Sequence, residues 1–125
     1  MQKKAKISLK TSEDDIKFSK IIEFKNNKIN YLEDDNTNVL LDLDKKLLIR
    51  DNKTIYLEYD FLKGKGYFYI KELRGETTVD IKLVKFINND KLIEIIYNID
   101  DKNYEYRIEM EWYYEYYKKY WKWNK

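Results

Sequence analysis

The sequence predicts an all-β protein: a single antiparallel meander closed into a barrel of roughly eight to ten short strands. Three observations lead to this fold class. Apolar and polar residues alternate with a period of two, turn-forming residues recur at short intervals, and no segment between turns keeps the helical period. We favour a closed barrel because one open sheet of about ten strands would leave its edges exposed.

The strands of the first half follow from this alternation. The opening residues 6–11 fit a first strand, residues 41–51 form an expected hairpin, and residues 54–61 alternate again. Between them, residues 16–24 place on one face Ile16, Phe18, Lys20, Ile22 and Phe24. Each such segment is expected to turn one face to the core and the other to water.

Two segments of the second half also read as strands. Residues 75–88 are an unusually long one, and their apolar parity changes between Leu83 and Val84, which predicts a β-bulge or sharp bend. Residues 104–112 alternate, with their apolar side chains at Tyr104, Tyr106, Ile108, Met110 and Trp112.

Clusters of Asn, Asp and Gly separate these strands. Such residues tolerate the positive φ of tight hairpins, and their side chains close turns locally. The expected turns are Asp14-Asp15, Asn26-Asn27-Lys28, Asp34-Asp35-Asn36, Asp44-Lys45, Asp51-Asn52, Lys63-Gly64-Lys65-Gly66, Arg74-Gly75, Asn88-Asn89-Asp90 and Asp100-Asp101-Lys102. We interpret the acidic doublets as turn residues rather than as calcium ligands, because the EF-hand spacing is missing.

The composition excludes several kinds of chemistry. The chain has no Cys and no His, so it has no thiol nucleophile, no histidine general base and no zinc site built on either residue. Its 3 glycines cannot form a phosphate-binding glycine motif. We therefore expect a non-catalytic protein without a cofactor or metal. An enzyme that uses carboxylates with Lys or Tyr remains an alternative.

The charge balance and the amino-acid composition indicate which partners and which kind of source organism to expect. The 25 basic and 23 acidic residues nearly cancel, and lysine greatly outnumbers arginine, so the nucleic-acid signal is weak. Abundant Lys, Asn, Ile and Tyr indicate an A/T-rich genome, which we take as bacterial. Without a signal peptide, a long apolar span or cysteines, we expect no transmembrane segment and a cytoplasmic location.

The C-terminal residues 113–125 differ from residues 1–112, which we expect to form the barrel domain. This extension holds seven aromatic residues, four lysines and one glutamate. We expect it to pack on the barrel or on a partner, including a second copy in a homodimer, as a strand or a short helix. The expected contacts are Trp112, Tyr116, Tyr120, Trp121 and Trp123. A lipid surface or single-stranded nucleic acid could also engage such residues.

The order of elements from residue 4 to residue 112 resembles the YwiB-like family of small bacterial proteins. The residues that carry the resemblance are the opening Lys6–Thr11, the hairpin Leu41–Asp51, the Gly64/Gly66 loop, the long strand from Thr77 and the hairpin around Asp100. The family usually has Arg-x-Gly where this chain has Arg50-Asp51-Asn52, and Thr-Pro-x-Gly where it has Glu72-Leu73-Arg74-Gly75. The resemblance implies a lipocalin-like (calycin) β-barrel and assigns no biochemical role.

Five residues are candidate ligand contacts inside or around the barrel. Lys20 shares the apolar parity of its strand, so it either enters the barrel or is turned outward by a bulge. Arg50, Arg74 and Arg107 offer planar guanidinium groups for an anionic ligand, or form surface ion pairs. Tyr59 lies on the apolar face of its strand. The sequence thus predicts a binding protein for a small apolar or amphipathic ligand, with an interaction module based on the C-terminal aromatics as the alternative.

Overall fold

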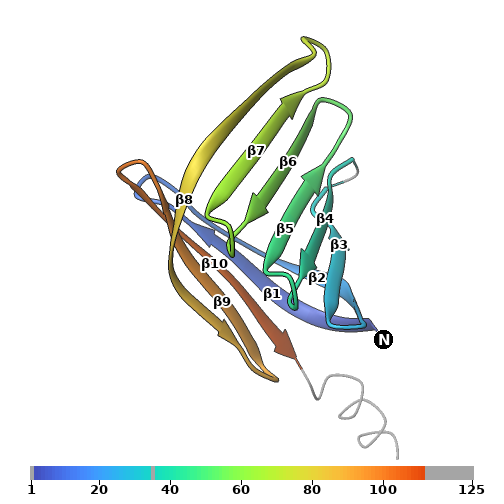
Figure 1. Ribbon diagram of the computed structural model, residues 1–125. Coiled ribbons are helices and arrows are strands. Elements are labelled where there is room, and N and C mark those ends of the chain that lie inside the picture. The colour runs from blue at the N-terminus through green and yellow to red at the C-terminus, as the bar shows by residue number, and fades with distance from the viewer. Residues whose placement is uncertain (1, 35, 112–125) are drawn as a thin grey trace, which may run out of the picture.

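The computed structural model describes residues 2–34 and 36–111. Within them, ten antiparallel strands follow one another as a meander and close into a barrel, as predicted (Figure 1). The strands are β1 (Gln2–Lys10), β2 (Asp15–Lys25), β3 (Lys28–Leu32), β4 (Asn38–Asp42), β5 (Leu47–Asp51), β6 (Ile55–Asp60), β7 (Lys65–Ile70), β8 (Gly75–Asn88), β9 (Leu92–Ile99) and β10 (Lys102–Glu111). Strand β1 pairs with both β2 and β10, which completes the circle.

The barrel is flattened into two layers that cross each other. Figure 1 shows β3 to β7 in one layer and β9, β10, β1 and β2 in the other. Strand β8 belongs to both layers, since its residues 75–80 pair with β7 and its residues 81–88 pair with β9. The two layers meet again where the β2–β3 hairpin joins them.

Strand β8 changes layers through a bulge. Leu83 pairs with Tyr97 and Lys85 with Ile96, so Val84 is an extra residue without a partner on β9. Val84 is 56% exposed, whereas Leu83 and Phe86 on either side both pack against the core. The parity change in the sequence therefore marks a real bulge, which bends the strand as one extra residue must.

The turns are closed by their own Asn and Asp side chains. Each of these side-chain oxygens accepts hydrogen bonds from the backbone N–H groups two and three residues further on, in the turns that begin at Asp34, Asp42, Asn52, Asp60 and Asn89. The two-residue loop Asn26-Asn27 has positive φ at both positions, as a type I′ hairpin requires. Local side-chain chemistry thus sets where the meander reverses.

The core gathers toward one end of the barrel. The largest fully buried side chains are Ile7, Ile22, Ile29, Val39, Leu41, Ile93, Ile95 and Ile108. Burying each of them contributes about 1.5–3 kcal/mol relative to exposure. Along the inward face of β1, Ala5 and Ile7 are buried, but Leu9 is only half-buried. The interior is therefore less tightly filled toward the β1–β2 hairpin, and this is where a cavity lies.

No helix in the described part of the chain is long and apolar enough to cross a membrane.

A tyrosine-lined cavity as the candidate functional site

A cavity of about 140 Å³ lies between the two layers of the barrel. Seven strands contribute side chains to it, because each places inward-facing residues at this level. The lining residues are Ile7, Leu9, Phe18, Tyr31, Glu33, Leu48, Arg50, Leu57, Tyr59, Tyr97, Tyr104 and Tyr106. The cavity is therefore mainly apolar and aromatic, with one cation and one carboxylate among these residues.

Packed aromatic rings form one wall. Tyr97 stacks on Tyr104 with ring centroids 5.3 Å apart and meets Tyr59 edge-on at 5.6 Å. Phe61 and Phe68 support these rings from behind, at 5.1 Å from Tyr97 and 5.8 Å from Tyr59. Such tilted and edge-on contacts favour fixed ring positions, so this wall is a preformed surface.

Gly66 makes room for the Tyr59 ring. The two residues are paired across β6 and β7, and a Cβ at Gly66 would lie 3.1 Å from Tyr59 Cδ1 and 2.9 Å from Val79 Cγ2. Only a residue without a side chain fits at this point unless its neighbours shift. The absence of a side chain in β7 therefore lets a large ring in β6 lie against the sheet.

Two tyrosine hydroxyls of the cavity lining bond each other. Tyr31 from β3 and Tyr106 from β10 share a hydrogen bond, and both side chains are buried. Burial raises the pKa of both phenols well above the usual value and outweighs the effect of their hydrogen bond on Tyr31. Burial also raises the pKa of Tyr59, to about 12. All three phenols are therefore neutral hydrogen-bonding groups at neutral pH.

An ion pair supplies the charged part of the lining. Arg50 on β5 donates from a terminal guanidinium nitrogen to a carboxylate oxygen of Glu33, just after β3. Their side chains are 38% and 24% exposed, so the pair lies closer to solvent than the buried tyrosines. The positive charge of Arg50 opposes the burial effect on the pKa of Tyr31, Tyr59 and Tyr97. No described residue accepts a hydrogen bond from Arg50 Nε, which is buried.

No protein-family model, curated protein or solved structure matches this chain. The resemblance to the YwiB-like family thus stays a prediction from the sequence.

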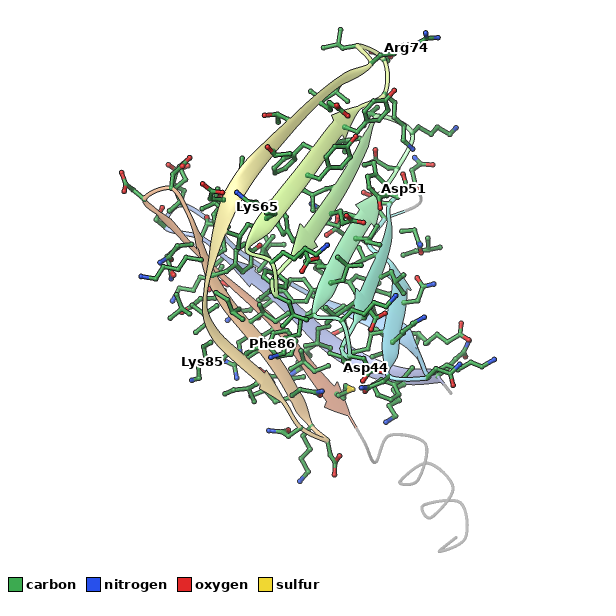
Figure 2. The ribbon with its side chains drawn as sticks, in the orientation of Figure 1. Asp44, Asp51, Lys65, Arg74, Lys85 and Phe86 are labelled. Carbon is green, nitrogen blue, oxygen red and sulfur yellow. The ribbon has the colours of Figure 1, made fainter. Side chains whose placement is uncertain are left out.

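The structure brings two of the five predicted ligand contacts together, namely Arg50 and Tyr59, which both line the cavity. Arg74 lies at the exposed tip of the β7–β8 hairpin, with a positive φ of 49° (Figure 2). Arg107 lies on the outer wall, where its Nε is 3.1 Å from an oxygen of Glu94 directly across on β9. Arg74 and Arg107 therefore do not line the cavity.

Lys20 lies on the inward side of β2, opposite the buried Ala5. The pairing of β2 with β1 runs from Gln2↔Glu23 to Lys10↔Asp15 without a shift, so no bulge turns Lys20 outward. Lys20 is half-buried and is not among the residues that line the cavity. A second lysine is more deeply buried: Lys3 Nζ lies 5.0 Å from the centre of the Phe24 ring, and burial lowers its pKa.

Sequence reasoning did not select the other polar residues of the cavity, Tyr31, Glu33, Tyr97, Tyr104 and Tyr106. One signal was present, because Tyr104 and Tyr106 share the apolar parity of Ile108. It did not show that distant strands would bring these phenols together. The predicted C-terminal contacts Trp112, Tyr116, Tyr120, Trp121 and Trp123, and the homodimer expected through them, lie outside the described residues.

Proposed function

We propose that this protein is a non-catalytic binding protein whose barrel cavity takes one small amphipathic molecule. The observation that carries the proposal is the preformed cavity of about 140 Å³, with aromatic walls and one guanidinium. Apolar cavities of about 150 Å³ hold a molecule the size of benzene, whereas drug-sized ligands need roughly 300 Å³ or more. The ligand is therefore a single ring or a short chain.

The polar lining favours a ligand with a hydrogen-bond acceptor. Arg50 makes its one described side-chain contact with Glu33, and its Nε has no accepting partner among the described residues. A carboxylate or carbonyl near the ion pair would complete the hydrogen bonding of the guanidinium. The ring of such a ligand would lie among the tyrosines, where apolar surface is removed from water.

The chemistry of the lining supports binding rather than catalysis. Burial moves the pKa of the Tyr31 and Tyr106 phenols further above neutral pH, and Glu33, the one carboxylate among the lining residues, is paired with Arg50. General acid–base catalysis usually relies on groups that titrate near the working pH.

A lipocalin-like relationship and a bacterial, cytoplasmic origin belong to the same proposal. The closed meander supports the former, and the codon-biased composition and absence of cysteine support the latter.

Fluorine NMR with two probes of equal ring size tests this function. We expect 4-fluorobenzoate to bind more tightly than fluorobenzene, and Leu57→Trp, which fills the cavity, to abolish binding of both. The double variant Arg50→Met/Glu33→Gln should weaken the benzoate at least tenfold and leave fluorobenzene within twofold. Arg74→Met, at the distant hairpin tip, serves as the matched control. Binding of neither probe, or binding that survives Leu57→Trp, would overturn the proposal.

A further inference from the structure

The barrel wall has a split beside β2. Strand β2 pairs with β1 from Asp15 to Glu23, but only three residue pairs join it to β3: Glu23↔Asn30, Phe24↔Ile29 and Lys25↔Lys28. Among the described strands, none pairs with the other edge of β2 from Asp15 to Ile22. Eight residues of this strand therefore present an unpaired edge.

The register identifies which backbone groups face the split. Thr11 N–H donates to the Asp14 carbonyl, so these two residues form a hydrogen-bonded pair at the β1–β2 turn. Such pairs alternate along antiparallel strands, so every second residue from Ile16 to Ile22 hydrogen-bonds to β1. The N–H and C=O groups of the residues between them point away from β1. These edge residues are Asp15, Lys17, Ser19 and Ile21.

The seam next to this edge is not filled. Continuing the register of Glu23↔Asn30 by two positions would pair Ile21 with Leu32, yet the strands diverge before that point and each of these side chains is 56% exposed. They flank a hollow of about 250 Å³. Ile16, at the far end of the edge, is 51% exposed although it lies on the inward face. Apolar side chains thus line a strand edge that lacks a partner.

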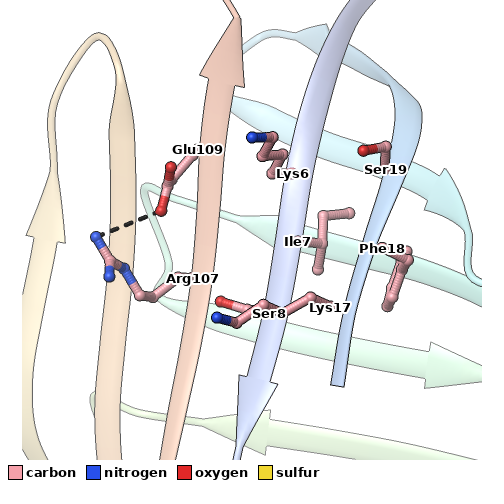
Figure 3. Close-up of a pocket in the computed structure, with 8 residues that line it drawn as sticks. All are labelled: Lys6, Ile7, Ser8, Lys17, Phe18, Ser19, Arg107 and Glu109. Carbon is pink, nitrogen blue, oxygen red and sulfur yellow. Dashed lines mark ion pairs between the residues drawn. The ribbon is translucent and has the colours of Figure 1, made fainter. Parts of the chain in front are cut away.

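The outer face beside the edge is basic. A shallow basin of about 440 Å³ lies across β10, β1 and β2, lined by Lys6, Ile7, Ser8, Lys17, Phe18, Ser19, Arg107 and Glu109 (Figure 3). The lining residues include three cations and one carboxylate, and Arg107 is already paired with Glu94 on β9 at 3.1 Å, so Lys6 and Lys17 supply the positive charge of the basin. Glu109 is already engaged, 3.5 Å from Arg107 and opposite Lys6 in register. Lys17 is paired only loosely, at 3.8 Å from the exposed Asp15.

We propose that the β2 edge binds an extended acidic peptide of another protein by strand addition. The peptide would pair with the backbone of the edge residues, as in other β-augmentation complexes. Its alternate side chains would face Ile16 and Phe18 on the inner side, and Lys17 and the basic basin on the outer side. Charge complementarity selects this occupant. The chain's own residues 113–125 carry four lysines and one glutamate, so they have the same sign as the basin.

Fluorescence anisotropy with two labelled ten-residue peptides tests this proposal on the full chain. One peptide alternates Val with Glu, and the matched peptide alternates Val with Lys. We expect the Glu peptide to bind at least tenfold more tightly at low salt and to weaken as salt rises. Lys17→Glu should reverse the preference. Equal binding of the two peptides, or no binding, would overturn the proposal.

A proline variant tests the backbone contact separately. Ser19→Pro removes one N–H that faces the split and none that pairs with β1, so it should weaken the Glu peptide at least tenfold. Ser19→Ala keeps the N–H and should bind within twofold of the parent chain. If Ser19→Pro lowers the melting temperature sharply, the charge reversal at Lys17 still decides the proposal.

Two further results would assign the edge to another occupant and overturn the proposal. Sedimentation equilibrium could show a dimer that Ser19→Pro dissociates, which would place a second copy on β2. Hydrogen exchange of the full-length monomer could show slow amides at Lys17 and Ser19 before peptide is added, which would mean that the chain's own C-terminal residues cover them. We expect a monomer in which these amides exchange fast and become protected by the Glu peptide.

Discussion

The hydrogen bond between Tyr31 and Tyr106 allows a quantitative test of the cavity. Both side chains are buried, at 4% and 5% exposure, and their hydroxyls bond each other across the barrel. Tyr106→Phe removes one hydroxyl and leaves the other without its partner. An unsatisfied buried hydroxyl costs about 1–3 kcal/mol, and the adjacent cavity lets water replace part of the lost bond. Tyr31→Phe leaves the Tyr106 hydroxyl without its partner in the same way. We therefore expect each of these two single variants to lose about 1.5 kcal/mol of unfolding free energy.

The double variant separates this hydrogen bond from other effects. With both hydroxyls replaced, no polar group is stranded, so the loss should be about 1 kcal/mol or less, well below the additive sum of about 3 kcal/mol. Urea unfolding followed by circular dichroism measures these values, and each 1 kcal/mol corresponds to roughly 4 °C in melting temperature. Tyr67→Phe is the control, because its hydroxyl bonds Glu76 on the exposed surface and should change stability by less than about 0.5 kcal/mol. Additive losses in the double variant would refute the reasoning.

Three further predictions follow from the glycines, one turn and the buried phenols. Gly66→Ala should lower the free energy of unfolding in urea by about 1–3 kcal/mol, because the new Cβ would meet the Tyr59 ring. Gly75→Ala is the control and should be nearly neutral, because nothing lies within 4 Å of a Cβ there. Equal effects of the two variants would contradict this reasoning. Arg74→Gly should raise the unfolding free energy by about 0.5–1 kcal/mol by relieving its positive φ of 49°, and any loss would argue against strain there. Folding raises the pKa of Tyr97 and other buried phenols above the unfolded value of 10.0. The stability that these neutral phenols contribute is therefore complete below pH 10, and the free energy of unfolding should fall as pH rises further. Absorbance at 295 nm should show these phenols ionising together with unfolding, and ionisation of all tyrosines near pH 10 in the folded protein would contradict the burial.

Much of the fold was predictable because its signals are local. A period of two follows from strand geometry, and it predicted strands over residues 16–24, 54–61 and 104–112 without knowledge of their partners. Of these residues, the structure describes all but residue 112. The turns were equally visible, since an Asx side chain closes a turn within three residues of itself, as at Asp42 and Asp60. The bulge at Val84 was predicted from a change of parity within a single strand.

The candidate site was only partly predictable. The sequence pointed to Arg50 because arginine is rare in this chain, and to Tyr59 because of its apolar parity, and both line the cavity. It pointed equally to Arg74 and Arg107, which lie at a hairpin tip and on the outer wall. Parity within a strand states which side a residue faces, but it does not state the level along the barrel at which that residue lies.

The turns, most of the strands and the face on which their residues lie were predictable from the sequence, because these features depend on neighbours a few residues away. Which inward residues meet depends on the packing of the whole barrel. Tyr31 and Tyr106 are 75 residues apart and share a hydrogen bond because closure through β1 brings β3 and β10 to the same level. Closure also decided that β2 and β3 separate after three residue pairs, although the alternation of residues 16–24 continues without a break. Register and closure arise from packing the two layers against each other, and that balance of burial across the whole barrel is not encoded in any one segment.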